Sequence, residues 1–171
     1  MLEVRDDPRR DTRCETLADA FAHSSNTAFA KWADRHLDAL RLARAAEALG
    51  FERPIPLVWP VEASRAQLQG LSPLERARAA AGFGHTTLSP LHGALIAAAI
   101  ARGGLMPQPI LVQDVRVPDG APPVVVPSPS VWLRSMSSEV AAELTAMMEA
   151  AVKDGTASRE FAPDKRPAHL M

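Results

Sequence analysis

Apolar residues recur at helical spacing throughout the first 50 residues of the chain. Within residues 37–49, leucine and alanine return every three or four positions, which predicts an amphipathic helix that Gly50 ends. Thr16 precedes a shorter pattern of the same kind, and another begins near Asn26 or Thr27. The sequence therefore predicts three consecutive helices in this region.

Two serine–proline pairs predict the starts of two more helices. Ser72-Pro73 and Ser89-Pro90 each place a capping serine before a proline at the first helical position. The helix after the second pair, over residues 91–101, is apolar on almost every side, so we expect it to be central and buried.

Strand signals are concentrated in one stretch. Residues 109–127, PILVQDVRVPDGAPPVVVP, contain two β-rich runs around Pro-Asp-Gly, which is typical of a hairpin. Residues 52–63 carry three prolines and are expected to be irregular. A last helix is predicted from a cap at Ser137 to a stop at Gly155. The expected fold class is mainly α with one β-hairpin.

Composition narrows the classes of function. The chain has 171 residues, 47 % of them hydrophobic, and a net charge of −1, so it can form a core and has no basic surface for nucleic acid. It has no apolar run long enough to span a membrane. The single cysteine and the spacing of the five histidines predict no metal site and no cofactor. We expect a polar entry at 1–15, one domain at 16–158 and a polar tail at 159–171.

The triplet Ser24-Ser25-Asn26 interrupts the apolar pattern between the first two predicted helices. A hydroxyl can relay a proton and a carboxamide can hold a substrate carbonyl, so the triplet is a candidate for chemistry. The alternative is that the serines end one helix while Asn26 caps the next. Spacing alone leaves both interpretations open.

Three blocks resemble one known family, in the right order along the chain. They are LADAFAHSSNTAFAKWADRHLDALRLARAAEALGF (17–51), GFGHTTLSPLHGALIAAAIARGGLMPQPILV (82–112) and the stretch from VRVPDG to KDGTAS (115–158). Together they resemble the transpeptidase domain of penicillin-binding proteins. The resemblance implies the helical lobe of the β-lactamase/transpeptidase-like α/β fold, without most of its sheet.

The resemblance assigns roles to four residues. Ser24 and Asn26 match the Ser-x-Asn motif, in which the serine helps to shuttle a proton and the asparagine orients the acyl substrate. Gly82 and Gly84 match a Gly-x-Gly loop beside the substrate, although the Phe83 between them departs from the usual glutamine. The ligands implied are a peptidoglycan stem peptide or a β-lactam, and the implied location is the periplasmic side of the cell envelope.

Two other motifs of the family do not occur in this sequence. The nucleophile of the family lies in Ser-x-x-Lys, but the residue three positions before each of Lys31, Lys153 and Lys165 is alanine. The Lys-Thr-Gly motif does not follow any of them either. We therefore expect a partial domain that is not catalytic by itself.

Two other classes of function compete with this one. The apolar helix at 91–101 must be covered by something, so the chain is alternatively a helical interaction module that binds a partner, its missing half or a second copy. A helix-turn-helix protein is suggested only by LARAAEALGF (42–51), and the near-neutral charge argues against it.

Overall fold

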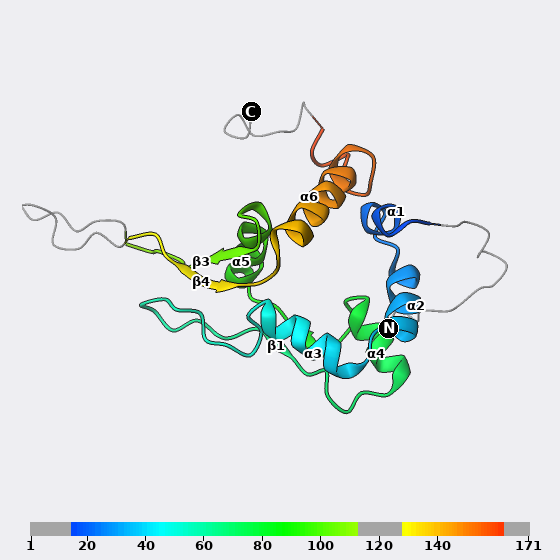
Figure 1. Ribbon diagram of the computed structural model, residues 1–171, viewed down its shortest axis with the longest axis horizontal. Helices are drawn as coiled ribbons and strands as arrows, with labels where there is room; N and C mark the ends of the chain where they lie inside the picture. The colour runs from blue at the N-terminus through cyan, green and yellow to red at the C-terminus, as the bar shows by residue number, and fades with distance from the viewer. Residues whose placement is uncertain (1–14, 113–127, 163–171) are drawn as a thin grey trace, which may run out of the picture. The chain divides into compact units, whose positions relative to one another are not determined.

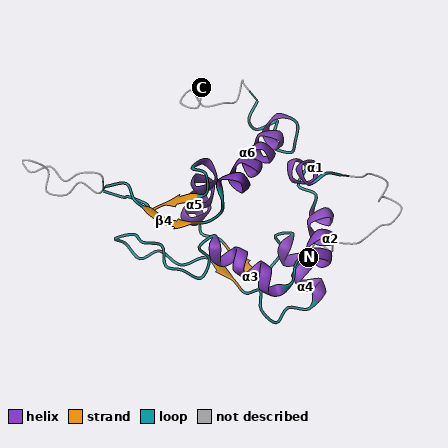
Figure 2. Cartoon of the chain, viewed as in Figure 1, coloured by secondary structure: helices purple, strands orange, loops and turns teal. Residues whose placement is uncertain are grey.

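The computed structural model describes residues 15–112 and 128–162, and these divide into two compact units. Within the described ranges, unit 1 comprises residues 15–43, 67–86 and 142–162, and unit 2 comprises 44–66, 87–112 and 128–141. Most regular structure in both units is helical (Figure 2). Most of the expected entry at 1–15, and part of the tail at 159–171, lies outside the described residues.

Unit 1 is built from helices around an alanine-rich core. Helix α2 packs against α4, and α1 contacts α2 (Figure 1). The bounds of the helices that contribute to this unit are α1 Leu17–Ala22, α2 Asn26–His36, α3 Ala39–Ala48, α4 Pro73–Ala80 and α6 Ser138–Lys153. Helices α3 and α6 each continue into unit 2. The buried residues on α1, α2 and α4 are all alanines, so these backbones can approach closely.

The predicted helix starts are confirmed at α1 and α4. The Thr16 hydroxyl accepts from the backbone N–H of Asp19, and the Asp19 carboxylate accepts in return from the Thr16 N–H. Ser72 and Glu75 form the same reciprocal pair at α4. Such capping boxes satisfy backbone donors that the first turn of a helix leaves unpaired.

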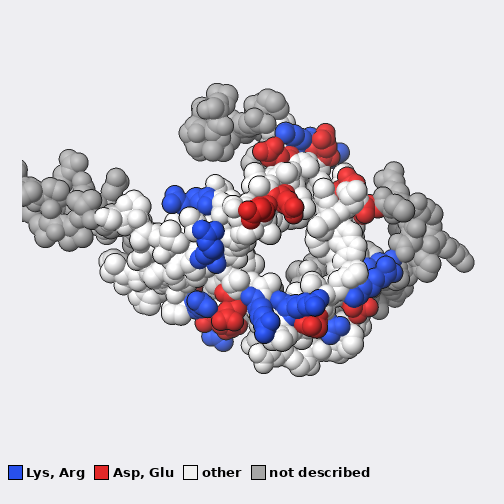
Figure 3. Space-filling view, viewed as in Figure 1, with Lys and Arg blue, Asp and Glu red and all other residues white. Residues whose placement is uncertain are grey.

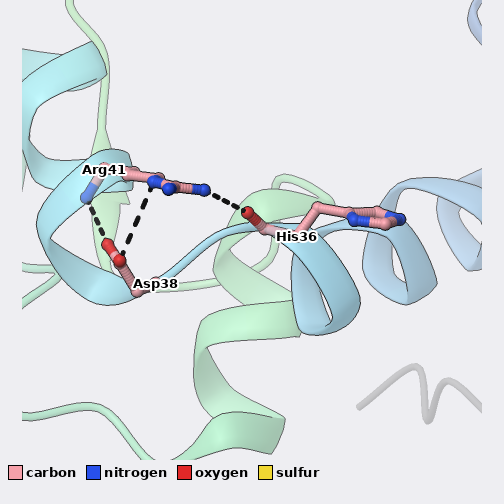
Figure 4. Close-up of polar contacts among 3 residues, drawn as sticks. All are labelled: His36, Asp38 and Arg41. Carbon is pink, nitrogen blue, oxygen red and sulfur yellow. Dashed lines mark hydrogen bonds and ion pairs between the residues drawn. The ribbon is translucent and has the colours of Figure 1, made fainter.

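The corner between α2 and α3 is fixed by one arginine (Figure 4). The Arg41 guanidinium donates to the carbonyl of His36, at the end of α2, over 3.1 Å. Its own backbone N–H donates to the Asp38 carboxylate over 2.7 Å, which makes Asp38 the cap of α3. The end of one helix and the start of the next are therefore held by the same residue, through its side chain and its backbone N–H respectively.

The core of unit 2 lies between helix α5 (Pro90–Ala101) and an antiparallel pair of strands, β3 (Leu105–Pro107) and β4 (Val131–Arg134). Helix α5 packs against β3. The strands β1 (Arg65–Ala66) and β2 (Thr86–Thr87) form a second, minimal sheet. The buried core residues of the unit are Ile55, Leu95, Ala99 and Met106.

The strand predicted at residues 109–112 needs correction. The run 109–112 forms no strand. The register of β3 and β4 is irregular between Met106 and Pro107. The last cross-strand backbone bond of the described residues runs from the Gln108 N–H to the Ser130 carbonyl, and neither Pro107 nor Pro109 has an N–H to donate. Strands β3 and β4 instead flank the predicted hairpin, whose Pro-Asp-Gly turn lies outside the described residues. The prediction of mainly α structure is confirmed, and the described residues contain two small strand pairs, β1–β2 and β3–β4, rather than one.

Helix α5 is buried on one face only, which corrects the expectation of a helix covered all round. Its buried residues are His92, Leu95 and Ala99, spaced three and four positions apart, whereas Ala94 and Ala97 are exposed. Alanine raises the apolar count of a helix, but its side chain is too small to require burial.

Candidate functional site

The Ser24 backbone adopts a left-handed conformation at the end of α1, with φ +53°. The Ser24 N–H donates to the Phe21 carbonyl over 3.1 Å, and the Ser25 N–H donates to the Ala20 carbonyl over 2.8 Å. This pair of bonds is a Schellman motif with Ser24 at the position where glycine is preferred. A residue with a Cβ costs roughly 1 kcal/mol there, so Ser24 is a locally strained position.

Asn26 is the first residue of α2 rather than its cap, so the capping interpretation is wrong for this residue. The N-cap position is taken by Ser25, whose side chain makes no capping hydrogen bond. Asn26 is exposed, and within residues 15–112 and 128–162 its carboxamide is not used to pair the start of the helix. The two serines do end α1, as that interpretation expected.

A segment 132 positions further along the chain holds the Ser24 corner in place. The Thr156 hydroxyl lies 3.2 Å from the Ser24 hydroxyl. The Thr156 backbone N–H donates to the Ala22 carbonyl over 3.0 Å. Gly155 lies so close to the same carbonyl that a Cβ on it would overlap the oxygen. The predicted stop of the last helix is therefore also a close contact with the Ser24 corner.

The Gly82–Gly84 loop follows α4 and has open space beside it. Gly82 and Gly84 have φ +87° and +67°, and a Cβ on either would meet nothing within 4 Å. Among the described residues, the backbone bonds of the loop run to α4 and to Gln67, which donates to the His85 carbonyl over 2.8 Å. Within the described residues, no hydrogen bond joins this loop to Ser24 or Asn26.

His92 is a buried residue of unit 2 and is 1 % exposed. Its Nε2–H donates to the Leu49 carbonyl over 2.8 Å, and its ring contacts Phe51 edge-on at 5.1 Å between centroids. This arrangement joins α5 to the end of α3. It supports a packing role for His92.

Acidic and basic side chains are interspersed on the surface of the described residues, and Figure 3 shows them next to each other at several places on the face in view. Near Ser24, the Thr16 hydroxyl holds the pKa of Asp19 below its usual value by hydrogen bonding to the carboxylate. In the part of the chain that the structure describes, no group of acidic, histidine or cysteine side chains is arranged to hold a metal ion.

Comparison with known proteins identifies the domain to which this geometry belongs. A family model for the penicillin-binding protein transpeptidase domain matches residues 3–167. The chain belongs to this family. The expected fold, a part of the transpeptidase α/β fold rich in its helices, is thereby confirmed.

Relatives of this transpeptidase-family chain are peptidoglycan D,D-transpeptidases named PbpA. The protein from Mycolicibacterium smegmatis is 30 % identical over 90 % of this chain and 34 % of its own length. The protein from Mycobacterium tuberculosis is 35 % identical over 85 % of this chain and 29 % of its own. The chain thus spans about a third of the length of these relatives.

Solved structures of transpeptidase domains superpose on this chain. The crystal structure of the Mycobacterium tuberculosis protein superposes with a TM-score of 0.73 at 32 % identity, covering 81 % of this chain and 32 % of that one. A D,D-transpeptidase domain from Eggerthella lenta superposes with a TM-score of 0.78 at 28 % identity, covering 87 % and 39 % respectively. One further structure of the Mycobacterium tuberculosis protein is a penicillin G acyl-enzyme complex.

The sequence pointed to Ser24 and Asn26 as candidates but not to Thr156, whose hydroxyl lies beside that of Ser24. The Gly-Thr-Ala at 155–157 was visible as part of the family resemblance, yet only as the end of a helix. Nothing in its composition says which distant loop it contacts. The available signal was the glycine before it, since a glycine after a helix also permits close backbone approach.

Proposed function

We propose that this chain supplies the Ser-x-Asn part of a D,D-transpeptidase site, with Ser24 and Asn26 contacting the ligand. The ligand is a peptidoglycan stem peptide, or a β-lactam that resembles it, as in the family relatives that are peptidoglycan D,D-transpeptidases. The proposed domain is 16–158, Gly82 and Gly84 form its substrate-side loop, and its place of work is the cell envelope.

The observation that carries the proposal is that neither polar side chain of the corner is used to cap α2. Ser24 and Asn26 are both exposed, and Ser24 occupies a backbone position that a glycine would fill with less strain. A strained position that keeps its polar side chain is a recognised feature of functional sites. These features support a role in ligand contact rather than in helix capping.

We further propose that this chain alone forms no acyl-enzyme. An acyl-enzyme needs an activated serine, and no lysine of this sequence has a serine three residues before it. Removing the nucleophile of a concerted catalytic site removes nearly all covalent catalysis. Contact with the ligand at Ser24 and Asn26 is then non-covalent.

Two measurements with benzylpenicillin test both halves of the proposal. Intact-mass analysis after incubation should find the mass unchanged. Amide NMR titration should find saturable shifts at residues 24–26, weakened by Asn26→Ala and unaffected by Glu143→Gln, an exposed control on α6.

Each measurement has a contrary result. A stoichiometric adduct that survives denaturation would mean that a serine here acts as nucleophile without the lysine motif. Shifts that are absent at residues 24–26, or that survive Asn26→Ala unchanged, would overturn the ligand contact.

A second candidate function, an interaction module, is favoured by an apolar groove in unit 2. The groove has a volume of about 690 Å³, and its lining includes Val58, Ile110 and Leu111. Val58 is 87 % exposed. If this groove binds another copy, light scattering across a hundredfold dilution should find a falling molar mass, and Leu111→Ser should abolish the larger species. A constant monomer mass would exclude the self-association form of this candidate.

A further inference from the structure

Two hydroxyls and one carbonyl form a short chain behind the Ser-x-Asn corner. The Ser24 Oγ lies 3.2 Å from the Thr156 Oγ1, which in turn lies 3.4 Å from the Ala22 carbonyl oxygen. A carbonyl can only accept, and each hydroxyl has only one proton to donate. The direction of the whole chain therefore depends on where the Thr156 proton points.

Only one arrangement makes both contacts hydrogen bonds. Thr156 must donate to the Ala22 carbonyl, and Ser24 must then donate to Thr156. From this we propose that Thr156 is a positioning residue that fixes the Ser24 hydroxyl as a donor toward the protein, so that its lone pairs are offered to the ligand. The inference rests on the proposed role of Ser24 and specifies which hydrogen-bonding group Ser24 offers.

The chain of bonds ends at a group that cannot take up a proton. A backbone carbonyl is not basic, so a proton cannot leave Ser24 by way of Thr156 and Ala22. Any proton that Ser24 takes up or releases must therefore pass on its ligand side. The ligand group that Ser24 meets in this arrangement is a hydrogen-bond donor, such as an amide or amine N–H.

The hydroxyl of Thr156 can be separated from its structural role. Its backbone N–H donates to the Ala22 carbonyl over 3.0 Å, and the adjacent Gly155 packs on the same oxygen. A valine at 156 keeps both of these features and the branched shape of the side chain. It removes only the hydroxyl, whereas a serine keeps the hydroxyl and removes a methyl group.

The test compares Thr156→Val with Thr156→Ser in the full chain, using NMR couplings that report the χ1 rotamer of Ser24. In the unmodified chain and in Thr156→Ser, one rotamer should dominate. In Thr156→Val, the ratio of that rotamer to the others should fall about two- to tenfold, as expected for loss of one neutral hydrogen bond. Thr87→Val, at an exposed threonine of β2, is the matched control and should change nothing at Ser24.

Amide hydrogen exchange at Ser25 and Thr156 shows whether the corner itself stays folded. Unchanged exchange together with a freed Ser24 rotamer supports the positioning role. An undisturbed Ser24 rotamer in Thr156→Val overturns it, as does a rotamer that Thr156→Ser fails to retain. If benzylpenicillin produces no shifts at residues 24–26 while the rotamer result holds, the proposed function fails and the positioning role stands.

Discussion

The ends of α1 and α3 have the same hydrogen-bond pattern but different residues at its left-handed position. At α3 the pattern joins Gly50 to Glu47 over 3.0 Å and Phe51 to Ala46 over 3.1 Å, with Gly50 at φ +93°. At α1 the equivalent left-handed position is Ser24. Helices α4 and α5 end in this way on glycine as well, at Gly82 and Gly103.

The surroundings explain why the two positions differ. A Cβ on Gly50 would lie 3.2 Å from the His92 Nε2 and 3.2 Å from the Trp132 ring, so close packing in unit 2 requires glycine there. The Ser24 side chain is exposed and reaches Thr156. Glycine is thus used where the core presses on the turn, and serine where a hydroxyl is presented, at a conformational cost.

The largest effect is expected from Gly50→Ala. The change forces a Cβ into the left-handed region and against His92 and Trp132, and should lower the free energy of unfolding by about 2 kcal/mol. Gly82→Ala is the matched control, because φ is similar and nothing lies within 4 Å. It should cost about 1 kcal/mol, from the backbone alone. Urea unfolding of both variants measures the difference.

Equal losses in the two variants would contradict the packing explanation for Gly50. The turn at α3 would then require glycine for its backbone conformation only, as at α4. Core packing would then not explain why position 50 is a glycine and position 24 is a serine.

A smaller effect of opposite sign is expected from Ser24→Gly. Glycine relieves the left-handed strain but is freer in the unfolded chain, so the net gain in stability should be about 0.5 kcal/mol. The same change removes the hydroxyl and should weaken the benzylpenicillin-induced shifts at Asn26. Thermal unfolding and the NMR titration measure the two effects.

His85→Gly is the matched control for Ser24→Gly. His85 is also exposed and left-handed, with φ +59°. It should give a similar gain in stability with no change in the ligand-induced shifts. If Ser24→Gly stabilises the chain and also leaves those shifts intact, Ser24 has no part in ligand contact.

Much of the helical framework follows from short-range signals. Thr16, Ser72 and Ser89 were recognisable as caps because a hydroxyl that accepts from a nearby N–H depends only on neighbours three residues away. Gly50 was recognisable as a stop because a glycine just after a helical pattern is also a local signal. The strand expected at 109–112 was wrong, because β-rich composition does not reveal where prolines and an irregular register limit the pairing.

The candidate site could be proposed from the sequence in its residues but not in its geometry. Family resemblance identified Ser24 and Asn26, yet spacing left their role open between capping and chemistry. That choice depends on the left-handed backbone of Ser24 and on its contact with Thr156, 132 residues away. Contacts at such separation arise from tertiary packing and leave no periodic trace in one sequence.

The smallest expected effect is a loss of helix stability at low pH, at the starts of α1 and α4. Hydrogen bonds from Thr16 to Asp19 lower the pKa of that carboxyl below 3.8, and those from Ser72 lower the pKa of Glu75 below 4.5. A carboxyl whose pKa is lowered by folding stabilises the folded chain above its unfolded pKa. That contribution is lost as the pH falls through the lowered value. Helicity at α1 and α4 should therefore decline once the pH falls below these values.

Carboxyl carbon NMR titration separates the two helices. Thr16→Val should raise the pKa of Asp19 toward 3.8 and leave Glu75 unchanged, and Ser72→Ala should do the reverse. Because α1 has six residues and ends on the strained Ser24, its amides should exchange faster in Thr16→Val than those of α4 do in Ser72→Ala. Equal exchange would mean that Thr156 and Gly155 hold the Ser24 corner without help from the start of α1.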